Sequence, residues 1–442
     1  MAGRLRQLQP ILLRCAHTHS ISTQPEAIQV TPKVSLFDQK VHIKVQGLPS
    51  KTKVTLHATT QQEWRRKPVE FTSCSHYITS DDGDLDLNRD VSVGGTYTGL
   101  DPMGPFWSLK PRPAGPQNIR MVVRNGDEPV LYNLSVYLGH LSLSDVVLTD
   151  TQVKPVYTTT VTRLKKSADV RRIPVREGNV RGILFLPPGE GPHPGVIDMF
   201  GSAGGLMELR ATLLASHGFA VLALPFFRYE DLPAKLEDVT FDYFEEAVSW
   251  FSSHSAVKND GIGVVAVSTG AQFALLMAWM CPQVKTVVFI NGPPFYWLYD
   301  LCRKDGTLVR KGVKMDLNFA TPTEEGLSIR DCFPHTTDSF IPVWESSAHV
   351  LVLQSDDDQQ VDPKLAGVLY NLYPEDKRHL LEVVHYPGAG HLLEPPYSPH
   401  CRYCVNPTFG MDFLWGGNPA DHAVAQEDSW NRILKFLKTH LS

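Results

Sequence analysis

The sequence predicts two domains of different class: an N-terminal antiparallel β-sandwich, followed by an α/β domain with a mostly parallel sheet and flanking helices. Three observations predict this arrangement. The chain has 442 residues, more than one ordinary hydrophobic core holds. From about Val30 to Asp150, short runs alternate apolar and polar residues. From Arg181 onward, apolar strand-like runs instead alternate with segments of helical periodicity.

The first 25 residues differ in composition from the rest of the chain. They contain Arg4, Arg6 and Arg14 together with several Leu, Ser and Thr, and the first acidic residue is Glu26. This composition is typical of an organelle transit peptide, so we expect residues 1–25 to direct the protein to the mitochondrial matrix. Their apolar part is too short and interrupted for a membrane anchor. The alternative is an irregular N-terminal tail on a cytosolic protein.

Residues 28–160 are expected to form the β-sandwich. Turn sequences such as Asp81-Asp82-Gly83-Asp84 separate runs in which every second residue is apolar. No long helical period interrupts these runs, which favours antiparallel strands packed in two sheets. The alternating apolar residues are Val41, Ile43 and Val45, then Val54, Leu56 and Ala58, then Leu134, Val136 and Leu138.

Residues 168–442 are expected to form the α/β domain. Helical faces occur in Asp238–His254 and near the C-terminus, around Trp430 and Leu437. The segment Asn291–Pro342 has no clear period and is expected to form a cap that shapes the substrate pocket. The candidate strands are Gly182–Leu186, Val196–Phe200, Phe219–Leu224, Ile262–Val267, Thr286–Ile290, Val350–Gln354 and Leu381–Val384.

Ser268 stands between the predicted strand Ile262–Val267 and an apolar, helix-like run, Phe273–Met280. A strand, a sharp turn and a helix with Ser at the apex form the nucleophile elbow of α/β-hydrolases. Thr269 and Gly270 are small enough for such a turn. Ser268 is therefore the candidate nucleophile, and the α/β domain is predicted to be an α/β-hydrolase domain.

Two other interpretations of this segment remain. A Ser before a Gly at the end of a buried strand can be purely structural. The stretch from Gly261 to Val284 also contains no charged residue, which would permit a membrane span. However, polar residues from Ser268 to Gln272 fall in its middle, so a strand and a buried helix explain it better and no stable membrane insertion is expected.

Asp358 and His391 are the expected partners of Ser268. In α/β-hydrolases the triad follows the chain order Ser, acid, His. The strand Val350–Gln354 leads into an acidic triplet that ends at Asp358, and the strand Leu381–Val384 leads into the loop that contains His391. His391 would accept the Ser proton, while the acid would orient its ring.

Each partner has an alternative. Asp357 is the alternative acid, and the acidic triplet could also be only a solvated turn. His391 could be a loop histidine without a role, since the chain has 17 His. His385, nearer the strand, is the weaker candidate.

An oxyanion hole is expected from two segments. A predicted strand that contains Asp198 ends in Gly201-Ser202-Ala203-Gly204-Gly205, a loop of small residues. Backbone N–H groups of Gly201 and Ser202 could face the developing negative oxygen, together with the N–H of Thr269. The alternative is a flexible connection. Asp198, inside the strand, is expected to make a buried structural hydrogen bond.

Charge and cysteine content argue against nucleic-acid binding and against a zinc site. A net charge of −5 and an isoelectric point near 6.4 give no sign of nucleic-acid binding. The seven Cys are scattered, as in a reducing compartment. Cys401 and Cys404 form a Cys-x-x-Cys motif without a second pair, so structural thiols are favoured over zinc. No cofactor and no metal are expected.

Nearly the whole chain after the transit-like segment resembles the type I acyl-CoA thioesterases and their relative, bile acid-CoA:amino acid N-acyltransferase. The resemblance implies a β-sandwich before an α/β-hydrolase domain, and a triad at Ser268, Asp358 and His391. The acid-to-His spacing differs by one residue from that family's pattern, which keeps Asp357 open. The segments that carry the resemblance are 94–104, 174–178, 195–201, 229–233, 243–247, 390–397 and 415–417.

The resemblance also implies the reaction. Transferases of this family carry Cys as the nucleophile, and an acyl-Cys thioester stays reactive toward amines such as glycine or taurine. Ser268 forms an oxygen ester, which is better suited to attack by water. We therefore expect an enzyme that hydrolyses fatty acyl-CoA to free fatty acid and CoA through an acyl-serine, with water as the acyl acceptor.

Two alternatives to hydrolysis stay open. One is an acyl-CoA:amino acid N-acyltransferase, and the other is an acyl-CoA-binding protein with a degenerate site. Ala266 and Ala271, where the related thioesterases have Gly, are expected to leave the elbow tighter.

Overall fold

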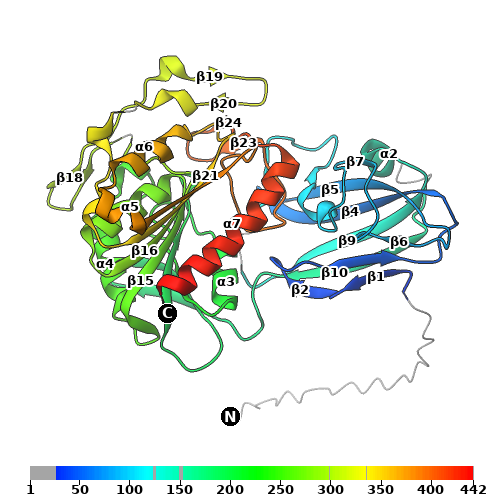
Figure 1. Cartoon of the computed structure of the whole chain (residues 1–442), viewed down its shortest axis with the longest axis horizontal. Helices are drawn as coiled ribbons and strands as arrows, with labels where there is room; N and C mark the ends of the chain where they lie inside the picture. The colour runs from blue at the N-terminus through cyan, green and yellow to red at the C-terminus, as the bar shows by residue number, and fades with distance from the viewer. Residues whose placement is uncertain (1–25, 123–125, 149–152, 298, 335, 442) are drawn as a thin grey trace, which may run out of the picture.

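The computed structural model describes residues 26–122, 126–148, 153–297, 299–334 and 336–441. Two N-terminal sheets use strands between Ile28 and Leu164, and one larger sheet uses strands between Arg171 and Tyr386 (Figure 1). The expected transit peptide, residues 1–25, lies outside the described residues.

The two N-terminal sheets pack on each other as a sandwich. Buried side chains of both sheets, such as Ile43 and Val136, belong to one hydrophobic core. The first sheet has the order β1 (Ile28–Thr31), β3 (His42–Val45), β6 (Leu85–Asp86). The second has the order β2 (Val34–Leu36), β10 (Tyr157–Leu164), β9 (Val130–Leu138), β4 (Lys53–Trp64), β5 (Lys67–Ile78), β7 (Gly94–Gly95), and β8 (Lys110–Pro111) also pairs with β5. Two short helices, α1 (Gly104–Trp107) and α2 (Leu143–Leu148), lie in the connections between these strands.

Two details of the sandwich differ from the sequence pattern. The short strand β2 pairs in parallel with β10, whereas the other pairs within these two sheets are antiparallel. Leu138 is 44% exposed although it continues the alternation of Leu134 and Val136. It is the last residue of β9, next to a turn at Gly139, and Tyr137 is buried instead.

The larger sheet is mostly parallel, as predicted, and each of the seven expected strands overlaps one observed strand. The sequence pattern missed β11, which pairs with β12 at the antiparallel edge. The strand order is β11 (Arg171–Glu177), β12 (Val180–Leu186), β14 (Ala220–Ala223), β13 (His193–Met199), β15 (Val257–Val267), β16 (Val284–Ile290), β21 (His349–Ser355), β22 (Leu381–Tyr386).

Helices cover both faces of this sheet. Helices α3 (Leu209–Ser216) and α7 (Pro419–His440) pack on one face, in the same core as the sandwich. Helices α4 (Asp242–Ser252), α5 (Thr269–Met280) and α6 (Lys364–Leu372) pack on the other face. Helix α4 is shorter than the predicted Asp238–His254, and Asp238 instead ends a separate 3-10 turn. The 3-10 turns are Leu236–Asp238, Leu317–Phe319, Arg330–Cys332, Thr337–Ser339, Val343–Glu345 and Glu375–Leu380.

The segment 291–342 forms short elements beyond the ends of the parallel strands. It includes the hairpin β17 (Leu301–Cys302) and β18 (Leu308–Arg310). Strands β19 (Thr321–Pro322) and β20 (Leu327–Ser328) join β24 (Met411–Leu414) and β23 (Tyr403–Asn406) in a small sheet.

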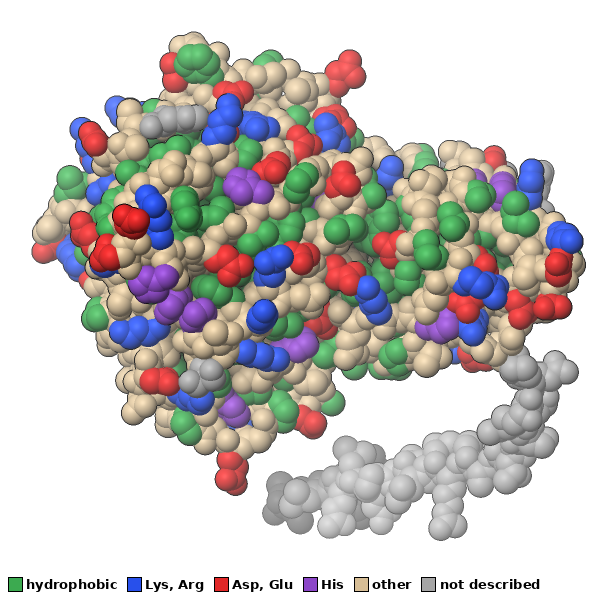
Figure 2. Space-filling model, viewed as in Figure 1, with side chains coloured by type: hydrophobic (Ala, Val, Ile, Leu, Met, Phe, Trp, Pro, Cys, Tyr) green, Lys and Arg blue, Asp and Glu red, His purple; other side chains and the backbone are tan. Residues whose placement is uncertain are grey.

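Helix α7 packs on the larger sheet and also contacts the N-terminal sandwich, and it lies between the two in Figure 1. Trp430 in α7 donates from Nε1 to Oδ2 of Asp38 over 2.9 Å, and Asp38 lies between β2 and β3. Basic and acidic side chains are interspersed on the face shown in Figure 2. Among the described residues, no helix combines the length and apolarity that a membrane crossing requires.

Candidate active site

Ser268 lies in a strained turn between β15 and α5. Its φ of +58° and ψ of −129° are rare for a residue with a side chain, as expected at a nucleophile elbow. The turn is tight because α5 begins close to the end of β13. A Cβ atom on Gly270 would lie 2.1 Å from the carbonyl oxygen of Phe200, the residue after β13. This geometry leaves Ser268 partly exposed while its neighbours are buried.

The structure brings Ser268, His391 and Asp358 together. Nε2 of His391 lies 2.9 Å from Oγ of Ser268, and Nδ1 lies 2.8 Å from Oδ2 of Asp358. Oδ1 of Asp358 accepts hydrogen bonds from the backbone N–H groups of Gln360 at 2.7 Å and Val361 at 3.0 Å. Because a carboxylate only accepts hydrogen bonds, Nδ1 carries the ring proton and Nε2 is free to accept one from Ser268.

Asp356 and Asp357, in the loop of Asp358, do not join this arrangement, nor does His385 in β22. Asp357 accepts hydrogen bonds from Gln359 Nε2 and from the backbone N–H of Gly417, both at 2.8 Å. Asp356 contacts His385 at 2.7 Å, where both side chains are exposed. Of the three adjacent Asp residues, Asp358 is the one whose carboxylate contacts His391.

The residues expected to form the oxyanion hole surround Ser268. A Cβ atom on Gly201 would lie 3.2 Å from Ser268 Oγ, so its backbone passes close to the hydroxyl. Thr269 is the first residue of α5, and its N–H therefore has no acceptor within the helix. Ser202 is held by two side chains: Asn406 Nδ2 donates to its Oγ over 3.1 Å, and Thr408 Oγ1 donates to its carbonyl.

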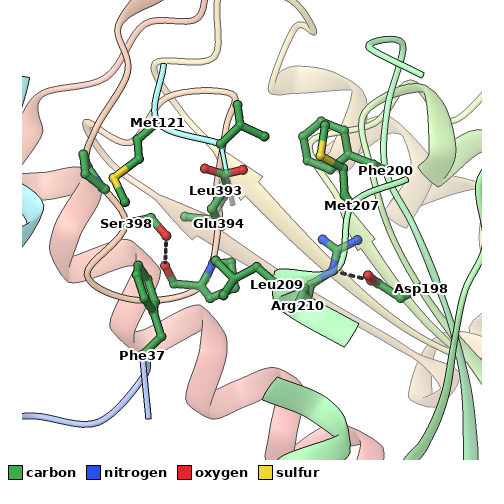
Figure 3. Close-up of a pocket in the computed structure, with 13 residues that line it drawn as sticks. Phe37, Met121, Asp198, Phe200, Met207, Leu209, Arg210, Leu393, Glu394 and Ser398 are labelled. Carbon is green, nitrogen blue, oxygen red and sulfur yellow. Dashed lines mark hydrogen bonds and ion pairs between the residues drawn. The ribbon is translucent and has the colours of Figure 1, made fainter. Parts of the chain in front are cut away.

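A buried ion pair supports the strand that leads to Gly201. Nε of Arg210, from α3, donates to Oδ1 of Asp198 in β13, and Nη2 donates to the carbonyl of Met199 at 2.7 Å. Figure 3 shows this guanidinium directed toward Asp198, with Phe200 and Met207 beside it. Burial raises the pKa of Asp198, against the opposing effect of Arg210. The expectation of a buried structural hydrogen bond at Asp198 is confirmed.

Three residues that sequence reasoning missed hold the loop of His391. Asn291, directly after β16, donates from Nδ2 to the carbonyl of His391 at 2.8 Å. Trp415 accepts the backbone N–H of His391 at 2.9 Å, and its ring lies parallel to the imidazole at 5.4 Å. His422, in α7, lies 3.1 Å from both the N–H of Gly390 and the carbonyl of Leu392. Trp415 belongs to a segment that carries the family resemblance, but no local pattern assigns any of the three to the loop of His391.

An apolar recess opens at Ser268. Segment 291–342, which was expected to form a cap, contributes Trp297, Ile329 and Phe333 to it. Phe413, in β24 of the small sheet, and Trp415 complete the wall; the sequence pattern did not assign either ring to the pocket. In the described part of the chain, no group of three or more His, Cys, Asp or Glu side chains is arranged to hold a metal ion.

The Ala residues of the elbow fit without displacing it. Ala266 is fully buried in β15, and Ala271 faces Gly292, which leaves room for its methyl group. The closer packing expected from Ala271 is therefore offset by a Gly on the opposite segment.

Two family models match the chain. Residues 38–177 match the model described as acyl-CoA thioester hydrolase/BAAT N-terminal region, and residues 239–442 match BAAT/acyl-CoA thioester hydrolase C terminal. Together they cover most of both halves of the molecule.

Individual relatives carry two kinds of name. The chain is 40% identical to acyl-coenzyme A amino acid N-acyltransferase 2 of Rattus norvegicus, over 93% of this chain and 97% of that protein. It is 39% identical to bile acid-CoA:amino acid N-acyltransferase of Mus musculus, over 94% and 97%. It is 36% identical to acyl-coenzyme A thioesterase 2, mitochondrial, of Homo sapiens, over 92% and 82%.

Proposed function

Because the chain belongs to the acyl-CoA thioester hydrolase/BAAT family, we propose that it is an acyl-CoA thioesterase that releases free fatty acid and CoA through an acyl-serine. The observation that carries the proposal is the 2.9 Å contact between Ser268 Oγ and His391 Nε2, on a ring that Asp358 holds from its other side. A Ser nucleophile with an imidazole nitrogen at hydrogen-bond distance is the arrangement that acyl transfer to Ser requires.

The first half of the reaction forms the acyl-enzyme. Ser268 Oγ attacks the thioester carbonyl carbon while His391 Nε2 takes the hydroxyl proton. The backbone N–H of Thr269, with N–H groups of Gly201 and Ser202, stabilises the negative oxygen of the tetrahedral intermediate. The intermediate collapses, the carbon–sulfur bond breaks, and the CoA thiolate leaves with the proton from His391.

The second half releases the fatty acid. A water molecule gives a proton to His391 Nε2 and attacks the acyl carbon of the ester on Ser268. The same backbone N–H groups stabilise the second tetrahedral intermediate. Its collapse returns the proton to Ser268 Oγ and frees the acid. Asp358 keeps its hydrogen bond to Nδ1 in both halves, which stabilises the charged ring each time it forms. The apolar recess of Trp297, Phe333 and Phe413 would hold the acyl chain.

A second candidate function is N-acyl transfer to an amino acid such as glycine or taurine. The observation that favours it is the higher identity to relatives named N-acyltransferases, at 40% and 39%, than to a relative named thioesterase, at 36%. The nucleophile favours hydrolysis, because an oxygen ester on Ser268 is less reactive toward amines than a thioester. A third candidate, a degenerate acyl-CoA-binding protein, would bind acyl-CoA without turnover.

One experiment separates the three candidates. Purified protein is incubated with a series of acyl-CoA chain lengths, with and without glycine or taurine, and free CoA, free acid and amide are measured. If the protein is a hydrolase, free acid forms with every substrate, with or without the amine. Amide in place of acid would support the transferase. Binding of acyl-CoA without release of CoA would support the degenerate binding protein. Ser268→Ala should lower turnover by several orders of magnitude, because the covalent step is lost. Ser268→Cys should still form an acyl-enzyme and shift part of the flux to the added amine.

We also propose the mitochondrial matrix as the place of the reaction. The Arg-containing, acid-free composition of residues 1–25 supports this location, and one relative carries the word mitochondrial in its name. Hydrolysis there would return CoA to other matrix reactions. The cytosol is the alternative.

A further inference from the structure

The thiols of Cys401 and Cys404 lie together beside the recess of Ser268. Cys404, in β23, is 4% exposed and lines a second hollow that Ser268, His391 and Trp415 also border. Cys401 precedes the strand and is partly exposed. Cys401 packs against the small apolar cluster that contains Cys404, and its Sγ–H donates to the carbonyl oxygen of Tyr403 over 3.3 Å. A disulfide requires two cysteines that lie close together, and these two are three residues apart in the chain and belong to one cluster.

Trp415 connects this thiol pair to His391. Its Nε1–H donates to Sγ of Cys404 over 3.1 Å. Its ring lies 5.4 Å from the imidazole of His391, with 18° between the ring planes. One side chain therefore contacts both the sulfur atom and the proposed general base, so a chemical change at Cys404 is transmitted to His391 through a single residue.

The surroundings favour Cys404 as the more reactive thiol. The neighbouring thiol of Cys401 is the largest cause that lowers the pKa of Cys404; Arg120 and Trp415 act in the same direction, against burial and Glu394. The sulfur of Cys404, together with burial, raises the pKa of Cys401. Since the thiolate is the form that attacks oxidants, the pair combines an attacking sulfur with a neighbouring thiol that can resolve the product.

We propose that Cys401 and Cys404 are a modification site for peroxides, at which a reversible disulfide forms and slows the chemistry of Ser268. The Cys404 thiolate attacks a peroxide oxygen, the O–O bond breaks, and hydroxide leaves a sulfenic acid behind. The Cys401 thiol then attacks the sulfenic sulfur, which forms the S–S bond and expels water. In total, two thiols lose two electrons and two protons, and hydrogen peroxide becomes two molecules of water.

The disulfide changes the contact that matters for His391. Once bonded to Cys401, Sγ of Cys404 moves from its present position against the indole N–H, so Trp415 loses the partner that orients its ring. The slower turnover of acyl-CoA rests on the proposed function, whereas the formation of the disulfide does not.

The test uses the full chain and three readouts. Protein is treated with hydrogen peroxide, or with diamide, which converts thiol pairs to disulfides, and is then reduced with dithiothreitol. Peptide mass spectrometry detects the bond between residues 401 and 404. Acyl-CoA hydrolysis and the rate at which a fluorophosphonate labels Ser268 measure its consequence; the labelling needs no acyl-CoA turnover. We expect the peptide to lose two hydrogen atoms, both rates to fall severalfold, and dithiothreitol to restore them.

Two variants sharpen the result. Cys401→Ser keeps Cys404 and its contact with Trp415, so its untreated rate should equal that of the wild type while diamide no longer affects it. Cys302→Ser, a partly exposed free cysteine elsewhere, is the matched control and should respond as the wild type does. The absence of a 401–404 disulfide, unchanged rates after it forms, or an unaltered diamide response in Cys401→Ser would each overturn the inference. A disulfide that slows fluorophosphonate labelling in a protein that never hydrolyses acyl-CoA would overturn only the proposed function.

Discussion

A Cβ atom on Gly292 would lie 2.5 Å from Cβ of Ala271, so the Gly after β16 leaves room for the methyl group on the first turn of α5. The same position also lies 3.0 Å from the carbonyl oxygen of Ser268 and 3.0 Å from the ring of Phe289. Packing beside the candidate nucleophile thus depends on a pair of small residues that are distant in the chain.

The first prediction tests this pair. Gly292→Ala should lower the free energy of unfolding by about 1–3 kcal/mol, the usual cost of an extra methyl group in a filled site. The double variant Ala271→Gly/Gly292→Ala should recover part of the loss, since one of three close contacts is relieved. Denaturant unfolding of the wild type, both single variants and the double variant gives the coupling energy. Strictly additive effects would show that the two sites are independent.

The second prediction concerns the acid. Asp358→Asn should lower kcat by about 10⁴-fold, a loss typical of triads in which the ring adopts the wrong tautomer. Asp357→Asn keeps an acceptor oxygen for the N–H of Gly417 and should change kcat little. The two variants are matched in chemistry and adjacent in sequence, and acyl-CoA hydrolysis with circular dichroism as a folding control distinguishes them. The opposite ranking would assign the role to Asp357.

The third prediction is a pH dependence of stability. Burial lowers the pKa of His422 to about 3, with a smaller contribution from His400. The unfolded ring takes up its proton near pH 6.5, whereas the folded ring stays neutral, with one nitrogen accepting from Gly390. The stability due to the neutral ring is therefore complete above pH 6.5 and is lost as the pH falls from there toward 3.

Replacing His422 measures this contribution. His422→Asn should be most destabilised relative to the wild type above pH 6.5. The difference in unfolding free energy should shrink by up to about 1.4 kcal/mol per pH unit between pH 6 and 4, because that is the limit for one proton. Subtracting the two curves cancels the other titrating groups. A difference that does not change with pH would contradict a depressed His422 pKa.

The fourth prediction concerns location. Residues 1–30 fused to a fluorescent protein should carry it into mitochondria, since their three Arg residues and lack of acidic residues before Glu26 favour import. A matched fusion in which Arg4, Arg6 and Arg14 are replaced by Gln should stay in the cytosol. A diffuse signal from the unaltered fusion would argue for the cytosolic alternative, and would leave the enzymology untouched.

The local pattern of the chain was sufficient for the class of both domains and for the order of the candidate site residues. Continuous apolar runs revealed seven of the eight strands of the main sheet, because a strand buried on both faces leaves such a run. They also placed Ser268, Asp358 and His391 just beyond strand ends. They missed β11, in which polar and charged residues outnumber apolar ones and Val175 is the one buried residue.

Only the tertiary structure decided which side chains meet. It distinguished Asp358 from Asp357, because one residue of difference in a turn directs a carboxylate toward a ring or toward the backbone of Gly417. It also showed that Asn291, Trp415 and His422 hold the loop of His391, although α7 follows that loop and Asn291 lies 100 residues before it. Such contacts join segments that are distant in the chain. The periodicity of a sequence indicates whether a side chain is buried, but not which other side chain it contacts. The contact partner is decided only when the folded chain brings the segments together in space.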